Sequence, residues 1–162
     1  MAPDIRPIRD KSIDELEGVS VDPPFESGMI ESISQARKVP IRDLSPAALR
    51  LLVSQGIALS YIYPLALEKL EERPLLWAQL YVGDLLSAAL HAEEKYGIRP
   101  EYRDRLNAVA NRALEQLTTV GPTDWDSDEP FDPNDPDEVD RESLEPKLRL
   151  ALERLEGRRP AV

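Results

Sequence analysis

The chain has 162 residues, of which 41% are hydrophobic and 31% charged, and a net charge of −11, values typical of one globular domain and not of a disordered chain. It contains no cysteine, which excludes disulfides and thiolate metal sites and is typical of a reducing compartment. No window approaches the roughly 18 apolar residues of a membrane span, and the N-terminus lacks the apolar run of a signal peptide, so we expect a cytoplasmic protein without a membrane partner.

The first third of the chain combines short helical patterns with proline-rich connections. Ser12 and Glu15 have the spacing of a capping box, and Gly18 can take the left-handed conformation that ends a short helix. A second helix is predicted over residues 26–37. Its buried face is expected to contain Met29, Ile30 and Ile33. Residues 39–42 form the only segment with the weak alternation of a strand.

Two helices are predicted in the middle of the chain from their start and stop signals. Ser45 and Pro46 mark the clearest start, because a capping hydroxyl precedes a proline at the first helical position. Gly56 is expected to end this helix. Ser60 is the predicted N-cap of the next helix, which Pro74 ends.

The second half of the chain is predicted to contain three longer helices. Asp84 is expected to cap a helix that ends near Gly97. Pro100 opens a long amphipathic helix that Gly121 closes. The apolar stripe of that helix consists of Leu106, Val109, Ala110, Ala113, Leu114 and Leu117. A final helix is predicted over residues 143–156, and its stripe consists of Leu144, Leu148, Ala151, Leu152 and Leu155.

Residues 122–140, between the last two helices, carry most of the negative charge. They contain seven Asp, two Glu and four Pro, no Lys or Arg, and no helical period. Because nine of the 31 acidic residues lie here, the other residues hold 22 acidic and 20 basic side chains, a nearly balanced set. The sequence therefore predicts an all-α protein, in which residues 1–162 form a single compact multi-helix domain with an acidic, proline-rich loop before the C-terminal helix.

This acidic segment is the candidate interaction site. A concentrated negative field repels phosphate backbones and attracts basic proteins, which argues against nucleic-acid binding. Trp125 and Phe131 are large apolar rings in a polar segment, a residue type that often anchors interfaces. The candidate interface residues are Asp124, Trp125, Asp126, Asp128, Glu129, Phe131 and Asp132. A solvated loop without a role and a calcium loop are the alternatives, although the glycine and glutamate that an EF-hand requires are missing.

Residues that catalysis needs are scarce. His91 is the only histidine, so no His–His metal pair can form, and no nucleophile elbow, Walker loop or dinucleotide-binding glycine pattern is present. His91 lies near the end of a predicted helix, where the helix dipole favours it. Helical spacing predicts a packing role for Tyr61, Tyr63, Trp77, Tyr81 and Tyr96, and a solvated helix face for Glu68, Glu71 and Glu72. We therefore expect a non-enzymatic protein with no metal and no cofactor.

Five short motifs follow one another in the first 95 residues. They are KSIDELE (11–17), PP (23–24), LRLLVSQGIAL (49–59), PLAL (64–67) and GDLLS (83–87). In this order they resemble the helical immunity proteins of bacterial contact-dependent growth inhibition (CDI) systems, and the resemblance covers about residues 11–95. It transfers no catalytic residue. Gln55, in the third motif, is interpreted as bonding backbone groups of a helix turn, with a partner contact as the alternative.

The resemblance implies a cytoplasmic protein that binds and neutralises a toxin domain delivered by a neighbouring cell. Toxins of such systems are often nucleases with basic substrate sites, so the implied partner is a basic toxin domain, whose charge an acidic inhibitor complements. An acidic helical adaptor or chaperone-like partner of a secretion or housekeeping complex is the alternative, and an enzyme with a carboxylate-based site is a third hypothesis. A gene for a secreted toxin beside this one would separate the first two.

Overall fold

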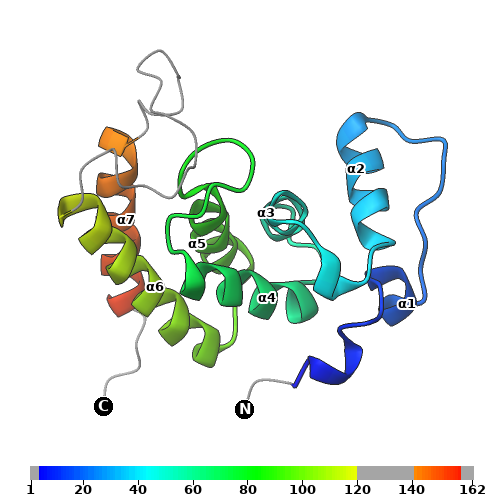
Figure 1. The fold of residues 1–162 in the computed structure, drawn as a ribbon, viewed down its shortest axis with the longest axis horizontal. Coiled ribbons are helices and arrows are strands. Elements are labelled where there is room, and N and C mark those ends of the chain that lie inside the picture. Colours follow the sequence, from blue (N-terminus) through cyan, green and yellow to red (C-terminus); the bar gives the residue numbers. More distant parts are fainter. Residues whose placement is uncertain (1–3, 120–140, 158–162) are drawn as a thin grey trace.

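Helices make up most of the described chain, which in this computed structural model comprises residues 4–119 and 141–157 (Figure 1). No strand occurs within these ranges, and the all-α prediction is confirmed. In chain order the elements are η1 (Arg6–Ile8), α1 (Ile13–Glu17), α2 (Gly28–Arg37), η2 (Ile41–Asp43), α3 (Pro46–Ser54), α4 (Leu59–Glu72), α5 (Asp84–Tyr96), α6 (Pro100–Thr119) and α7 (Arg141–Gly157), where η marks a 3-10 helix.

The helices follow one another along the long axis of the molecule (Figure 1). α1 and α2 lie at one end, and α6 and α7 pack side by side at the other. Between them α3 packs against both α4 and α5, and α4 also contacts α6. The middle helices therefore connect the two ends. No helix within the described ranges is long and apolar enough to cross a membrane.

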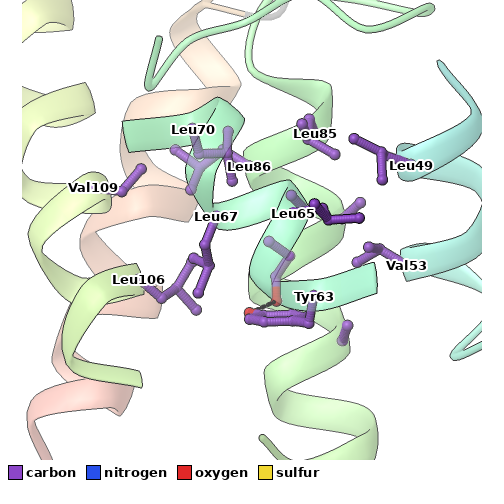
Figure 2. Close-up of a cluster of buried hydrophobic side chains, with 14 of the residues drawn as sticks. Leu49, Val53, Tyr63, Leu65, Leu67, Leu70, Leu85, Leu86, Leu106 and Val109 are labelled. Atoms are coloured by element: carbon purple, nitrogen blue, oxygen red, sulfur yellow. Dashed lines mark hydrogen bonds between the residues drawn. The ribbon is translucent and has the colours of Figure 1, made fainter. Parts of the chain in front are cut away.

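The core lies where α3, α4, α5 and α6 meet (Figure 2). Residues 62–67 of α4 are all buried, so this helix is covered on every side there. The Tyr63 hydroxyl donates a hydrogen bond to the Ala89 carbonyl at 2.8 Å, which satisfies the one polar atom of that side chain. Burial raises the pKa of Tyr63, so the phenol keeps its proton. Around it pack Leu49, Val53, Leu65, Leu67, Leu70, Leu85, Leu86, Leu106 and Val109.

The predicted helix starts at Ser12 and Ser45 are confirmed. The Ser12 hydroxyl accepts a hydrogen bond from the Glu15 backbone N–H (3.2 Å), and the Glu15 carboxylate accepts one from the Ser12 N–H (2.7 Å). The Ser45 hydroxyl accepts one from the Ala48 N–H at 3.2 Å. Gly18 has the expected left-handed conformation, with φ +67°. Caps of this kind stabilise a helix by about 1 kcal/mol each.

Two predicted element boundaries are wrong. Ser60 does not cap α4, because the helix begins one residue earlier, after Ala58, whose φ of +50° turns the chain without a side-chain cap. Residues 39–42 form no strand: Pro40 makes one isolated antiparallel bridge with Ser12, and η2 follows. Proline has no N–H to donate, so a strand ladder cannot continue through this position.

The buried face of α2 also differs from the predicted one. Met29 is exposed and the other two residues of the predicted face are half-buried, whereas Arg37 at the end of the helix is buried. Its guanidinium donates to the carboxylates of Asp14 (2.8 Å) and Glu17 (2.7 Å), and so joins α2 to α1. A buried guanidinium requires such partners, because its donors have lost water. This polar contact joins α2 to α1, and Ala36 and Ile33 pack the helix on the core.

The two C-terminal helices agree with the predictions. α6 buries its predicted stripe, with only Leu114 half-buried. α7 includes the predicted residues 143–156, and all five residues of its stripe are buried. Because α6 and α7 contact each other and both bury their apolar stripes, apolar burial at roughly 25 cal/mol per Å² is the main force that joins them.

Gly56, in the turn after α3, has no space for a side chain. Gly56 has φ +69°, and a Cβ atom at this position would lie 2.6–2.8 Å from ring atoms of Tyr96, the last residue of α5. We expect Gly56→Ala to lower the free energy of unfolding by about 1 kcal/mol for backbone strain, plus the packing lost by the displaced ring. Gly18→Ala is the matched control, because Gly18 has nearly the same φ with no atom within 4 Å of an added Cβ.

Urea unfolding followed by far-UV circular dichroism measures both substitutions in the wild-type and in a Tyr96→Ala background. In the Tyr96→Ala background, Gly56→Ala should lower the free energy of unfolding no more than Gly18→Ala does. Such a double-mutant cycle isolates the coupling between two contacting residues, here Gly56 and the Tyr96 ring. If the two glycine substitutions lower the free energy of unfolding equally in the wild-type background, the close contact between position 56 and the Tyr96 ring would be contradicted.

Candidate functional site

The loop between α4 and α5, residues 73–83, exposes two large apolar side chains. Trp77 is 44% exposed and Leu80, three residues later, is 45% exposed. The remaining exposed large apolar side chains of the described chain lie on four other elements or connections: Val19, Val21, Met29, Tyr96 and Leu150. A tryptophan and a leucine presented together by one loop, here named the α4–α5 loop, make this surface the candidate interaction site.

A buried carboxylate fixes the shape of the α4–α5 loop. Asp84 is 2% exposed, and its oxygens accept hydrogen bonds from three consecutive backbone N–H groups, those of Ala78 (2.7 Å), Gln79 (2.9 Å) and Leu80 (2.7 Å). These charge-assisted bonds offset the cost of burying the carboxylate. The prediction that Asp84 caps α5 is therefore wrong: Gly83 is the N-cap, and Asp84, the first residue of the helix, bonds the loop instead.

Two other helices support the same loop. On α3, the Nε of Arg50 lies 3.8 Å from an oxygen of Asp84, an ion pair too long to be a hydrogen bond. On α7, Leu144 packs so closely against Gly83 that a Cβ there would lie 2.9 Å from the leucine Cδ2. Gly83 also has φ +82°, a conformation that glycine adopts readily. The loop is thus held by α3, α5 and α7, which lie far apart in the sequence.

This arrangement suits binding of a protein partner. A loop that already presents its apolar side chains loses little conformational entropy on binding, so more of the contact free energy is retained as affinity. Within residues 4–119 and 141–157, no group of three or more His, Asp or Glu side chains is placed to hold a metal ion. His91 lies exposed on α5. We therefore take the α4–α5 loop as the candidate interaction surface of the described residues.

The seven interface residues predicted from the acidic segment lie outside the described residues. They are Asp124, Trp125, Asp126, Asp128, Glu129, Phe131 and Asp132. Their role stays a prediction. Within the described residues, Leu144 of α7 packs against Gly83 at the end of the α4–α5 loop.

The aromatic spacing points to the wrong role for two residues of this region. Trp77 and Tyr96 are predicted to pack in the core, but each is more than 40% exposed, and Tyr63 is the fully buried residue of the predicted aromatic set. Pro74 is the residue in the sequence that indicates otherwise for Trp77. It follows the end of α4 and places Trp77 in a loop, where helical spacing does not predict burial. Sequence reasoning therefore misses the α4–α5 loop as a site.

The acidic side chains of α4 lie on a partly solvated face, as the sequence predicts, with the Glu68 and Glu71 side chains 40% and 38% exposed, but two of the three are also paired with arginines. Glu68 forms an ion pair with Arg9, and Glu71 accepts two hydrogen bonds from Arg105, at 2.6 and 2.8 Å. The hydrogen bonds from Arg105 lower the pKa of Glu71. Glu72 is exposed, as predicted. Most of this charge is thus neutralised within the protein.

Gln55 does not have the structural role predicted from its motif. Its side chain is exposed at the end of α3. The N–H groups of Gly56 and Ile57 donate to the carbonyls of Val53 (3.1 Å) and Leu52 (2.9 Å). Backbone hydrogen bonds therefore close this turn, and the exposure of Gln55 is compatible with a contact to a partner.

We predict that Asp84→Asn loosens the α4–α5 loop. Asparagine offers one acceptor oxygen where Asp84 offers two, and its NH₂ group would face a loop N–H. The free energy of unfolding should fall by about 2 kcal/mol, as for other hydrogen bonds to charged groups, and amide hydrogen exchange should accelerate at residues 78–80. Glu72→Gln, an exposed control, should change stability by less than ~0.5 kcal/mol. Unchanged exchange at residues 78–80 would argue against the role of Asp84.

A comparison with protein families matches residues 15–109 to the family described as CDI immunity proteins, which confirms the resemblance of the motifs. The match covers more than half of the chain and includes the whole α4–α5 loop with Asp84. It ends within α6, so α7 lies beyond it. No curated protein and no solved structure matches the chain. This protein therefore belongs to the CDI immunity proteins, non-enzymatic inhibitors that neutralise a CDI toxin.

Proposed function

We propose that this immunity protein neutralises a basic nuclease toxin in the cytoplasm by one-to-one binding, and that the α4–α5 loop docks on the toxin. The observation that carries the proposal is the exposed pair Trp77 and Leu80 on a loop whose backbone Asp84 holds in place. Aromatic anchors that are rigid before binding dominate the affinity of many protein interfaces.

The charge distribution supports a basic partner. On the described helices, arginines and carboxylates pair with one another, as in Arg9–Glu68, Arg37–Asp14, Arg103–Glu93, Arg105–Glu71 and Arg154–Glu94. Residues 122–140 contain nine acidic side chains and no Lys or Arg, so this segment dominates the long-range field of the chain. A nuclease binds a polyanion, and a basic substrate site is complementary to this segment.

The acidic segment and the α4–α5 loop act at different stages of binding in this proposal. Acidic side chains steer the encounter over a Debye length of about 8 Å at physiological ionic strength, whereas buried apolar anchors slow dissociation. In this proposal one toxin surface engages both the acidic segment and the α4–α5 loop. The acidic segment would then occupy basic groups that the substrate needs.

We predict that Trp77→Ala and Leu80→Ala weaken binding of the cognate CDI toxin domain. Isothermal titration calorimetry should give one toxin per immunity protein, and Trp77→Ala should raise Kd about 30-fold, equivalent to ~2 kcal/mol. Leu150→Ala, which removes an exposed leucine on α7, is the matched control and should leave Kd within about twofold. Wild-type affinity in both loop variants would place the toxin on another surface.

A separate prediction concerns the acidic segment. Changing Asp124, Asp126, Asp128 and Asp132 together to Asn should slow association with the toxin by about tenfold at low salt and flatten its salt dependence, with a smaller change in dissociation. Stopped-flow measurements at several salt concentrations provide both rates. Unchanged association and unchanged toxin neutralisation would mean that the segment is a passive loop.

A further inference from the structure

A second group of exposed apolar side chains lies at the α1–α2 end of the molecule. Val19 (57% exposed) and Val21 (36%) lie on the connection between α1 and α2, and Met29 (49%) lies in the first turn of α2. They are three of the seven large apolar side chains that are exposed in the described chain. We name residues 18–29 the α1–α2 surface. Grouped exposed apolar side chains mark interaction sites, and the α4–α5 loop uses none of these three.

Two buried side chains of α2 hold the backbone of this connection. Arg37 donates a hydrogen bond to the Val19 carbonyl at 3.3 Å, and the Ser34 hydroxyl donates one to the Val21 carbonyl. Because Arg37 and Ser34 lie one helical turn apart, the connection runs beside α2 in the opposite direction (Figure 1). The backbone is therefore fixed while both valine side chains are left exposed. A segment ordered in this way loses little conformational entropy on binding.

The exposed apolar side chains lie close enough together for one partner to cover them. Arg37, which holds Val19, is eight residues from Met29, a distance of roughly 12 Å along the axis of α2. One partner contributes about 800 Å² to a standard interface, an area that spans such a distance. In Figure 1 the start of α2 and the α4–α5 loop also lie on the same, upper side of the molecule, so one partner along this side can contact both.

The charge of the α1–α2 surface selects the kind of partner. Residues 12–38 contain six acidic side chains and two basic ones, Arg37 and Lys38. Glu26 and Glu31 are exposed and have no ion-pair partner among the described residues. A second copy of the chain would bring the same negative charge to this surface, and so would the acidic segment 122–140. Like charges repel, so a basic protein surface is the complement.

We infer that the α1–α2 surface is a second contact region for the toxin. Val19, Val21 and Met29 pack against apolar side chains of the toxin, and Glu26 and Glu31 face its lysine or arginine side chains. The inference rests on the proposed function for the identity of the partner and its basic charge, but not for the place of contact. The family match over residues 15–109 includes the whole α1–α2 surface.

Isothermal titration calorimetry of the full-length protein with the cognate toxin domain tests the apolar contacts. Val19→Thr combined with Val21→Thr, which nearly keeps the side-chain shape, should raise Kd about tenfold, and Met29→Ala should raise it about fivefold. Leu150→Ala, at an exposed position on α7, is the matched control for Met29→Ala and should leave Kd within about twofold. All these side chains are exposed, so each variant should keep the wild-type Tm, which separates a lost contact from a lost fold.

Stopped-flow association at low salt tests the charges. Glu26→Gln combined with Glu31→Gln should slow association about threefold. Glu153→Gln combined with Glu156→Gln is the control, because it removes the same charge from exposed positions on α7 and should leave the rate nearly unchanged. Equal slowing by the two pairs would mean that net charge alone acts, and would contradict a local contact at α2.

Amide hydrogen exchange of the complex separates this inference from the docking of the α4–α5 loop. Toxin should slow exchange at residues 19–22 as well as at residues 78–80. Protection at 19–22 alone would support the inference and remove the α4–α5 loop from the interface. Protection at 78–80 alone, with wild-type affinity in the α1–α2 variants, would overturn the inference. A toxin-free dimer in sedimentation velocity that Val19→Thr with Val21→Thr dissociates would also overturn it, because a second copy would then cover this surface.

Discussion

A carboxylate removed from water must receive hydrogen bonds from groups close to it, and Asp84 meets this requirement with three consecutive N–H groups of the preceding loop. The same side chain begins α5 and lies beside Arg50 of α3. One buried charge therefore sets the course of the loop, the start of a core helix and the position of a second helix. The exposure of Trp77 and Leu80 follows from this constraint, because the clamped backbone leaves their side chains outside the core.

The C-terminal helix α7 lies beyond the region that matches the family, but it also supports the α4–α5 loop. The match ends within α6, yet α7 buries a full apolar stripe and places Leu144 against Gly83. Gly83 tolerates the contact because it has no Cβ and adopts φ +82°. α7 is thus packed into the structure, and Leu144 near its start contacts the end of the loop that carries the exposed apolar side chains.

Electrostatics divide the chain into two parts with different physical roles. On the helices, ion pairs between distant elements, such as Arg37 with Asp14 and Arg105 with Glu71, use charge to hold the fold. The charged residues of 122–140 are all acidic, and uncompensated charge acts over distance on other molecules. Three buried donor groups of the described chain, the Nε–H groups of Arg9 and Arg50 and the Tyr102 hydroxyl, receive no hydrogen-bond acceptor from the protein.

The sequence by itself determined the features that depend on interactions between residues within about four positions of each other along the chain. The caps at Ser12 and Ser45 and the buried stripes of α6 and α7 are of this kind, because capping and helical periodicity are local. Family membership was likewise visible in short ordered motifs. Tertiary structure alone decided that Asp84 bonds the loop and does not cap its helix, and that Glu71 pairs with Arg105. The physical reason is that a polar side chain takes the partners that folding brings to it, and here those choices depend on helices from distant parts of the chain.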